Sequence, residues 1–297
     1  MSKYRIFLLG TNDINEGIKC VDNDIEQIKT FFKNYEYTAK IATATTETTL
    51  ALELENYISD LNEEDIFIFY YAGHSLLSDN SLYLFINGEE IDFNIAINRI
   101  LKKNKKIKKV LFILDSCSSG KINSLIDNEL STFRAITATN HVHKSIEMNQ
   151  NNADDFEIKE PLGFFTHFLL TSMERIFQTS KEIKVNDLGK EIELQIKNYK
   201  ELSLPTPRLY GGKNNFSFIA KHDCETIINT FYQENCTSDF NTFLNNLDTR
   251  IEQCLFTDCS NSTTLKQLIK IFRLENLTPN SKEELLKTIN NELKKCL

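Results

Sequence analysis

A thiol and an imidazole each follow an apolar run of the sequence. His74 comes directly after Gly73 and the run Phe67–Ala72, and Cys117 follows the run Val110–Leu114 by three residues. A thiol beside an imidazole can ionise to a thiolate, which is the reactive nucleophile. We therefore predict nucleophilic attack by Cys117 with His74 as its acid–base partner, and an oxyanion hole made by the backbone N–H groups of Gly73 and Cys117.

This chemistry requires both residues to lie beyond the carboxyl ends of neighbouring strands, at the same edge of one sheet. The sequence around them predicts such a sheet. Apolar runs alternate with helical spacings over the first two-thirds of the chain. We expect strands over 4–10, 39–44, 65–72, 81–86, 110–114, 133–139 and 215–220, and helices over 23–35, 48–61, 93–103, 163–178 and 185–199. The alternation predicts an α/β fold with a mostly parallel sheet flanked by helices. Ligands bind such sheets at the carboxyl ends of the strands.

The pattern changes after about residue 222. Four helical spacings follow, and no strand pattern occurs among them: 224–232, 240–255, 264–272 and 282–293. We therefore predict two domains, a catalytic domain over 1–221 and a small all-helical domain over 222–297.

Composition excludes several function classes. The net charge of −8 argues against a nucleic-acid partner, and the lysines over 102–109 are interpreted as a solvated surface. No apolar run approaches the roughly 20 residues that span a bilayer, and the first ten residues lack a signal-peptide layout. The seven cysteines show no Cys-x-x-Cys spacing and form no zinc-like cluster with the five histidines. We expect a cytoplasmic protein with no membrane partner and no metal.

The two motifs resemble those of the caspase-like cysteine peptidases, type C14, in particular the metacaspase and bacterial caspase-like branch. Tyr71-Ala-Gly-His74 and Asp115-Ser-Cys-Ser-Ser-Gly120 carry the resemblance, and His74 precedes Cys117 by 43 residues. Weaker likenesses at 8–10, 20–25, 136–139, 163–166 and 205–208 extend it over about residues 3–220. Two residues depart from the family pattern: Ala72 stands where some members have Ser, and Ser75 where Gly is often found.

The resemblance implies a protein substrate and assigns two acids. Asp24 and Asp115 match the metacaspase residues that line the S1 pocket, so cleavage after Arg or Lys is expected. A carboxylate pair would attract a guanidinium or ammonium group and reject an acid. The simpler interpretation makes Asp24 a helix-start acid and leaves Asp115 held by backbone N–H groups.

The resemblance also bears on regulation. Some metacaspases need calcium, but the acidic pair Asp154 and Asp155 is interpreted as a solvated loop, and no EF-hand spacing exists. We therefore expect no cofactor. Bacterial relatives often carry helical adaptor domains, so residues 222–297 are expected to bind a regulatory partner in a defence or cell-death pathway.

Three alternatives stay open. The chain could be an inactive caspase-fold adaptor or scaffold, although it retains both His74 and Cys117. It could be an active protease with acidic P1 specificity. It could also be a different thiol enzyme on a parallel sheet, such as an amidase, although a Gly-rich nucleophile elbow is missing.

Overall fold

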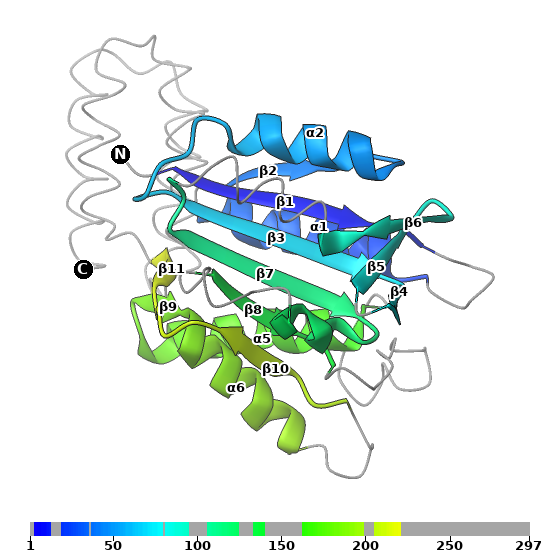
Figure 1. The fold of residues 1–297 in the computed structure, drawn as a ribbon. Helices are drawn as coiled ribbons and strands as arrows, with labels where there is room; N and C mark the ends of the chain where they lie inside the picture. The colour runs from blue at the N-terminus through cyan, green and yellow to red at the C-terminus, as the bar shows by residue number, and fades with distance from the viewer. Residues whose placement is uncertain are drawn as a thin grey trace, which may run out of the picture. The chain divides into compact units, whose positions relative to one another are not determined.

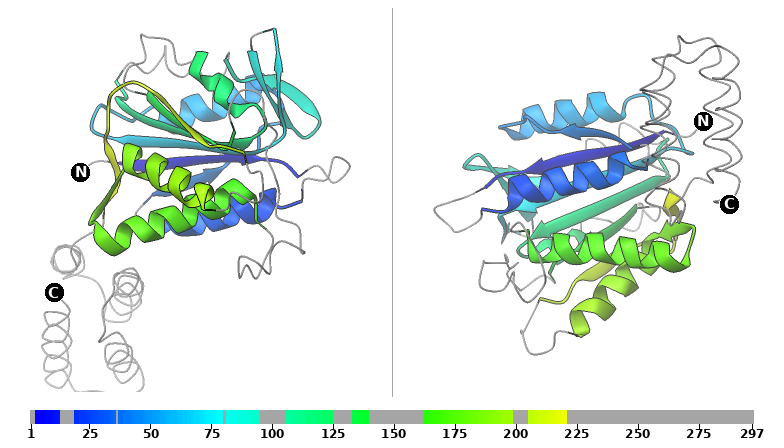
Figure 2. Two further views of the ribbon diagram at one scale, coloured as in Figure 1. Left: turned by 90° about the horizontal axis from the view of Figure 1, so that it is seen from below. Right: turned by 180° about the vertical axis from the view of Figure 1, so that it is seen from behind.

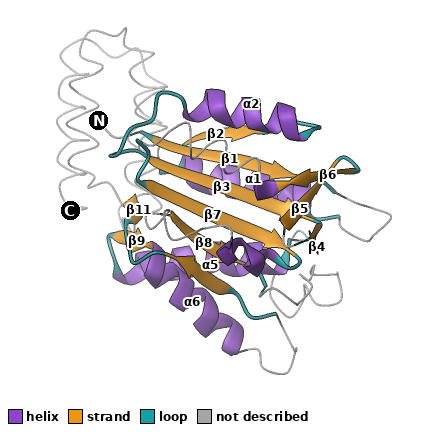
Figure 3. Cartoon of the chain, viewed as in Figure 1, coloured by secondary structure: helices purple, strands orange, loops and turns teal. Residues whose placement is uncertain are grey.

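A six-stranded sheet forms the centre of the chain in a computed structural model that describes residues 3–12, 19–35, 37–79, 81–94, 106–124, 133–139, 162–198 and 205–220. Its strand order is β10-β8-β7-β3-β1-β2 (Figures 1 and 3). The strands are β1 (Tyr4–Gly10), β2 (Thr38–Ile41), β3 (Ile66–Gly73), β7 (Lys109–Ser116), β8 (Phe133–Thr137) and β10 (Arg208–Gly211). All neighbours pair in parallel except β10, which runs antiparallel to β8.

Helices and small sheets cover both faces of the central sheet (Figure 2). One face packs against α1 (Val21–Lys33), α5 (Phe164–Thr179), α6 (Val185–Lys197) and the two-stranded sheet of β9 (Glu182–Lys184) and β11 (Ser217–Ala220). The other face packs against α2 (Glu47–Ile58), the 3₁₀ helix η1 (Ser119–Ser124), and the three-stranded sheet of β4 (Ser75–Ser78), β5 (Ser81–Ile86) and β6 (Glu89–Asp92).

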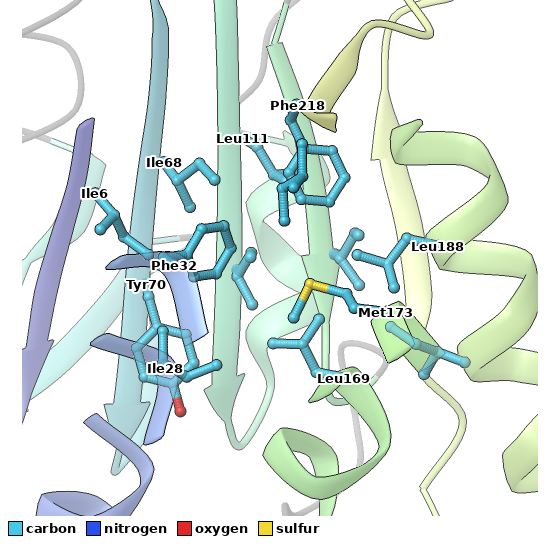
Figure 4. Packing of buried hydrophobic residues seen from close by; sticks show 14 of the residues in the cluster. Ile6, Ile28, Phe32, Ile68, Tyr70, Leu111, Leu169, Met173, Leu188 and Phe218 are labelled. Atoms are coloured by element: carbon cyan, nitrogen blue, oxygen red, sulfur yellow. The ribbon is translucent and has the colours of Figure 1, made fainter. Parts of the chain in front are cut away.

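The apolar runs of β3 and β7 account for this double layer. Successive side chains of a strand point to opposite faces, and β3 is buried along its whole length. Ile68 and Tyr70 of β3 therefore join the core beneath α1 and α5, while Phe67 and Phe69 join the core on the α2 face. Figure 4 shows the first of these cores, in which side chains of the sheet meet those of α1 and α5.

The predicted α/β fold with a mostly parallel sheet flanked by helices is confirmed. Strands β1 and β5 have the predicted bounds, and most other predicted elements shift by one to three residues. The strand expected over 215–220 is present as β11, which pairs with β9 in a separate two-stranded sheet, and β10 is the edge strand of the central sheet beside β8. The short strands β4, β6, β9 and β10 were not predicted.

Some expectations fall outside the described residues. Most of the helix expected over 93–103 and all of the helices expected after residue 222 are among them. The chain divides into units of residues 1–220 and 221–297, and the described residues all belong to the first. The helical domain over 222–297 stays a prediction. Within the described ranges, no helix has the length and apolar character needed to cross a bilayer.

Candidate active site

The register of β3 and β7 brings the two motifs side by side. The strands are parallel neighbours, and their last paired residues are Gly73 and Ser116. His74 directly follows β3, and Cys117 directly follows β7. The hydroxyl of Ser75 donates a hydrogen bond to the carbonyl oxygen of Cys117, so contact between the two chain segments continues beyond the last strand pair. Both predicted catalytic residues therefore leave the same edge of the sheet.

The backbone of His74 is held firmly, whereas part of its ring is not. Its carbonyl oxygen accepts hydrogen bonds from the Phe85 N–H at 3.0 Å and from the Tyr71 hydroxyl. Its ring meets the Phe85 ring edge-on at 6.3 Å. The Nε2 atom is buried and makes no hydrogen bond to the described residues. An unpaired buried nitrogen costs about 1–3 kcal/mol, so such an atom in a folded protein calls for a reason, of which a catalytic role is one.

Tyr71 of β3 supports this arrangement through its hydroxyl group, and no role was predicted for it from the sequence. Its hydroxyl lies 3.0 Å from the Phe85 carbonyl oxygen as well as bonding that of His74. Burial raises the pKa of Tyr71 well above its usual range, the Phe85 hydrogen bond opposes the shift, and the Coulombic interaction with Cys117 adds to it. The phenol is thus a neutral donor close to the thiol.

Gly73 has a conformation that a side chain would strain. Its φ is +144°, and a Cβ built on it would lie 2.9 Å from the Tyr71 hydroxyl oxygen. The site therefore requires glycine between Tyr71 and His74.

The two predicted S1 acids meet at the start of α5. Asp24 and Asp115 are 2 % and 6 % exposed. The Gly163 N–H donates to Asp24 Oδ1 at 2.7 Å, and the Thr166 N–H and hydroxyl donate to Asp115 Oδ2 at 3.2 and 2.8 Å. A Cβ on Gly163 would lie 2.7 Å from Oδ2 of each acid, so both carboxylates approach one point. The start of α5 carries the partial positive charge of the helix dipole, which attracts carboxylate groups.

Tyr70 extends this hydrogen-bond network into the core. Its hydroxyl lies 2.6 Å from Thr166 Oγ1. Since Thr166 donates its proton to Asp115, Tyr70 is the donor to Thr166. Burial raises the pKa of Tyr70 well above its usual range, and the charges of Asp24 and Asp115 raise it further. The chain Tyr70–Thr166–Asp115 is a second feature that the sequence analysis missed.

The remaining site expectations concern metals. Among the described residues, no group of three or more His, Cys, Asp or Glu side chains could hold a metal ion. Asp154 and Asp155 lie outside the described residues. The absence of a cofactor stays a prediction.

The chain matches a model of a known protein family. The family model Peptidase_C14, described as the caspase domain, matches residues 8–295. The match includes all the site residues above and continues past residue 220, where the quoted motifs end. No curated protein sequence matches the chain.

Proposed function

The chain belongs to the caspase-domain family Peptidase_C14, and from this premise we propose that it is a cysteine endopeptidase with Cys117 as nucleophile and His74 as acid–base partner. The observation that carries the proposal is the pairing of Gly73 with Ser116, which sets His74 and Cys117 next to each other at one sheet edge. The buried Nε2 of His74 supports it, because this atom makes no hydrogen bond within the described ranges and a catalytic imidazole needs a nitrogen available to the reaction.

The proposed reaction has two halves. The Cys117 thiolate attacks the scissile carbonyl carbon, and the negative charge that forms on its oxygen is bound by the N–H groups of Gly73 and Cys117. The imidazolium of His74 then gives its proton to the leaving amine, and an acyl-enzyme remains. A water molecule, deprotonated by His74, attacks this thioester and releases the carboxylate product and the free thiol.

We further propose that the substrate is cut after Arg or Lys. The buried pair Asp24 and Asp115 supports this, because two carboxylates that approach one point form a strong receptor for a single cation. Their hydrogen bonds from Gly163 and Thr166 hold the oxygens in place in the absence of a substrate. An acidic P1 side chain would be repelled by the same groups.

A panel of fluorogenic peptides that differ only at P1 tests both proposals. We expect turnover with Arg and Lys at P1, none with Asp, and none from Cys117→Ala or His74→Ala. Asp24→Asn and Asp115→Asn should each lower kcat/KM for Arg substrates by about 30-fold or more, since loss of a buried charge partner costs at least about 2 kcal/mol. A preference for Asp would overturn the S1 assignment while leaving the peptidase intact.

The inactive-scaffold alternative makes a different prediction. A thiol-directed probe should label Cys117 faster than the other cysteines in an active enzyme. Equal labelling of all accessible thiols, together with no turnover, would favour the scaffold.

The cellular role proposed here rests on the family resemblance. We propose that residues 222–297 bind a regulatory partner and that the cytoplasmic enzyme acts in a bacterial defence or cell-death pathway. Cells expressing the chain should resist phage better than cells expressing Cys117→Ala, measured as efficiency of plating. Equal plating on both strains would contradict this role.

A further inference from the structure

We propose that Ser75 and Thr139 clamp the two peptide planes on either side of Cys117, and so aim its N–H group and its sulfur at the same bound carbonyl. The proposal rests on the proposed peptidase function and adds two positioning residues to it. The two hydroxyls come from opposite sides of β7: Ser75 follows β3, and Thr139 follows β8.

Thr139 holds the peptide plane before Cys117. Its hydroxyl donates to the Ser116 carbonyl oxygen at 3.3 Å, and the residue is fully buried. Thr139 is itself fixed, because its N–H lies 3.4 Å from Ser119 Oγ and its carbonyl accepts from the Thr137 hydroxyl at 2.8 Å. The hydrogen bond to the Ser116 carbonyl is therefore made by a buried residue whose own backbone is held in place.

Ser75 holds the peptide plane after Cys117. Its hydroxyl donates to the Cys117 carbonyl oxygen, and the residue is buried at the start of β4, where it pairs with Leu84 of β5. Glycine at this position could not make the bond.

Peptide geometry links these contacts to catalysis. A trans peptide unit is planar, and its C=O and N–H groups point in opposite directions. Holding the Ser116 oxygen on one side therefore turns the Cys117 N–H to the other side, as an oxyanion donor requires. Holding the Cys117 carbonyl as well fixes both φ and ψ of Cys117, and with them the direction of its Cα–Cβ bond.

The turn that follows Cys117 is strained, so it would relax if the two clamp hydrogen bonds were lost. Ser118, the next residue, has a φ of +51°, a left-handed conformation that costs a non-glycine residue about 1–2 kcal/mol. Bonds at residues 116 and 117 oppose that relaxation.

The clamp predicts a specific kinetic defect. Deleting an oxyanion donor costs about 10²–10³ in kcat. Loss of one clamp hydroxyl misaligns the donor without removing it, so Thr139→Val and Ser75→Ala should each lower kcat about tenfold with KM little changed. Thr139→Ser and Ser75→Thr keep a hydroxyl and should recover most of the activity.

Two chemical probes separate positioning from general damage. A peptide aldehyde adds to the thiol and forms a tetrahedral adduct with an oxyanion, so its affinity should fall in parallel with kcat. Iodoacetamide alkylates the thiolate by direct displacement of iodide and forms no oxyanion. Its rate at Cys117, followed by peptide mass spectrometry, should stay within about twofold of the parent.

Matched controls come from α5. Thr171 and Ser172 carry hydroxyls that bond to the helix and to Gln195, away from Cys117. Thr171→Val and Ser172→Ala should leave kcat, aldehyde affinity and alkylation unchanged.

Two results would overturn the clamp: kcat equal to that of the parent in both Thr139→Val and Ser75→Ala, or alkylation at Cys117 that slows as much as turnover does. A parent that cleaves no peptide would instead contradict the proposed function. Binding of the peptide aldehyde can be measured without turnover. Its affinity for the Ser75 and Thr139 variants, compared with the parent, therefore still tests whether these hydroxyls orient the Cys117 N–H.

Discussion

Gly73 and Ser116 are the last register partners of β3 and β7, and the two proposed catalytic residues lie immediately beyond them. The two strands are buried along nearly their whole length, which leaves no freedom for one to slide along the other. A one-residue slip would turn every side chain of a strand to the opposite face of the sheet. The separation of His74 and Cys117 is therefore set by the core of the protein.

Gly73→Ala should impair both stability and activity. The strained backbone costs about 1–3 kcal/mol, and the new Cβ would press on the Tyr71 hydroxyl that holds His74. Gly88→Ala is the matched control, because Gly88 also has a positive φ but no atom lies within 4 Å of its Cβ position. Thermal unfolding should show a lower Tm for both variants, whereas only Gly73→Ala should lose peptidase activity. Comparable activity in the two variants would argue against a role for Tyr71 in holding His74.

Gly163→Ala should weaken binding of the P1 side chain. A Cβ at 2.7 Å from an oxygen of each acid forces Asp24 and Asp115 to move. We expect KM for an Arg substrate to rise about tenfold or more with a smaller change in kcat, since in the proposed S1 pocket the carboxylates would contact P1 and not the reacting atoms. In the control Gly189→Ala, the three atoms nearest to the new Cβ all belong to the Leu209 side chain, at 3.1 Å or more, so KM should be unchanged. An unaltered KM in Gly163→Ala would remove the acids from the S1 assignment.

The Tyr70–Thr166–Asp115 chain predicts unequal costs for its two hydroxyls. Thr166→Val leaves the buried Tyr70 hydroxyl without its acceptor and takes a donor from Asp115, which should cost about 1–3 kcal/mol. Tyr70→Phe leaves Thr166 bonded to Asp115 and should cost only about 0.5–1.5 kcal/mol. Urea unfolding of both single variants and the double variant measures this. The double variant should cost less than the sum, and strict additivity would contradict the chain.

The free energy of unfolding should fall as the pH drops below the usual pKa of histidine, partly because of His167. Burial lowers the pKa of His167 in the folded protein below its unfolded value of 6.5. The neutral ring thus contributes stability above pH 6.5, and this contribution is lost as the pH falls through the folded pKa. In His167→Gln, the free energy of unfolding should depend less on pH between about pH 7 and pH 5. An unchanged profile would mean that His167 titrates alike in both states.

Much of the fold could be predicted because its main strands are long and apolar. Burial on both faces leaves runs such as Ile66–Gly73 with no alternative to a central strand. The short strands escaped prediction for the opposite reason. β10 has only four residues, lies at the sheet edge and follows Pro205 and Pro207, so its pattern resembles a loop.

The site was predicted only where a residue type carries its own chemistry. Cys117, His74 and the acids can be recognised from local motifs, but Ser75, Thr139 and Thr166 cannot. Their hydroxyls form hydrogen bonds with partners 42, 23 and 51 residues away, and a sequence pattern contains no signal for such contacts.

The way in which α5 holds both acids restricts how this protein could evolve a new cleavage preference. Exchanging Asp24 or Asp115 for a basic residue would place a cation at the positive end of the helix, next to the acid that remains. In each single exchange the new cation would pair with the acid that remains, so the intermediate should bind neither a basic nor an acidic P1 side chain well. Laboratory selection for acidic substrates should therefore recover paired replacements of Asp24 and Asp115, and lineages lacking such pairs should keep their original preference.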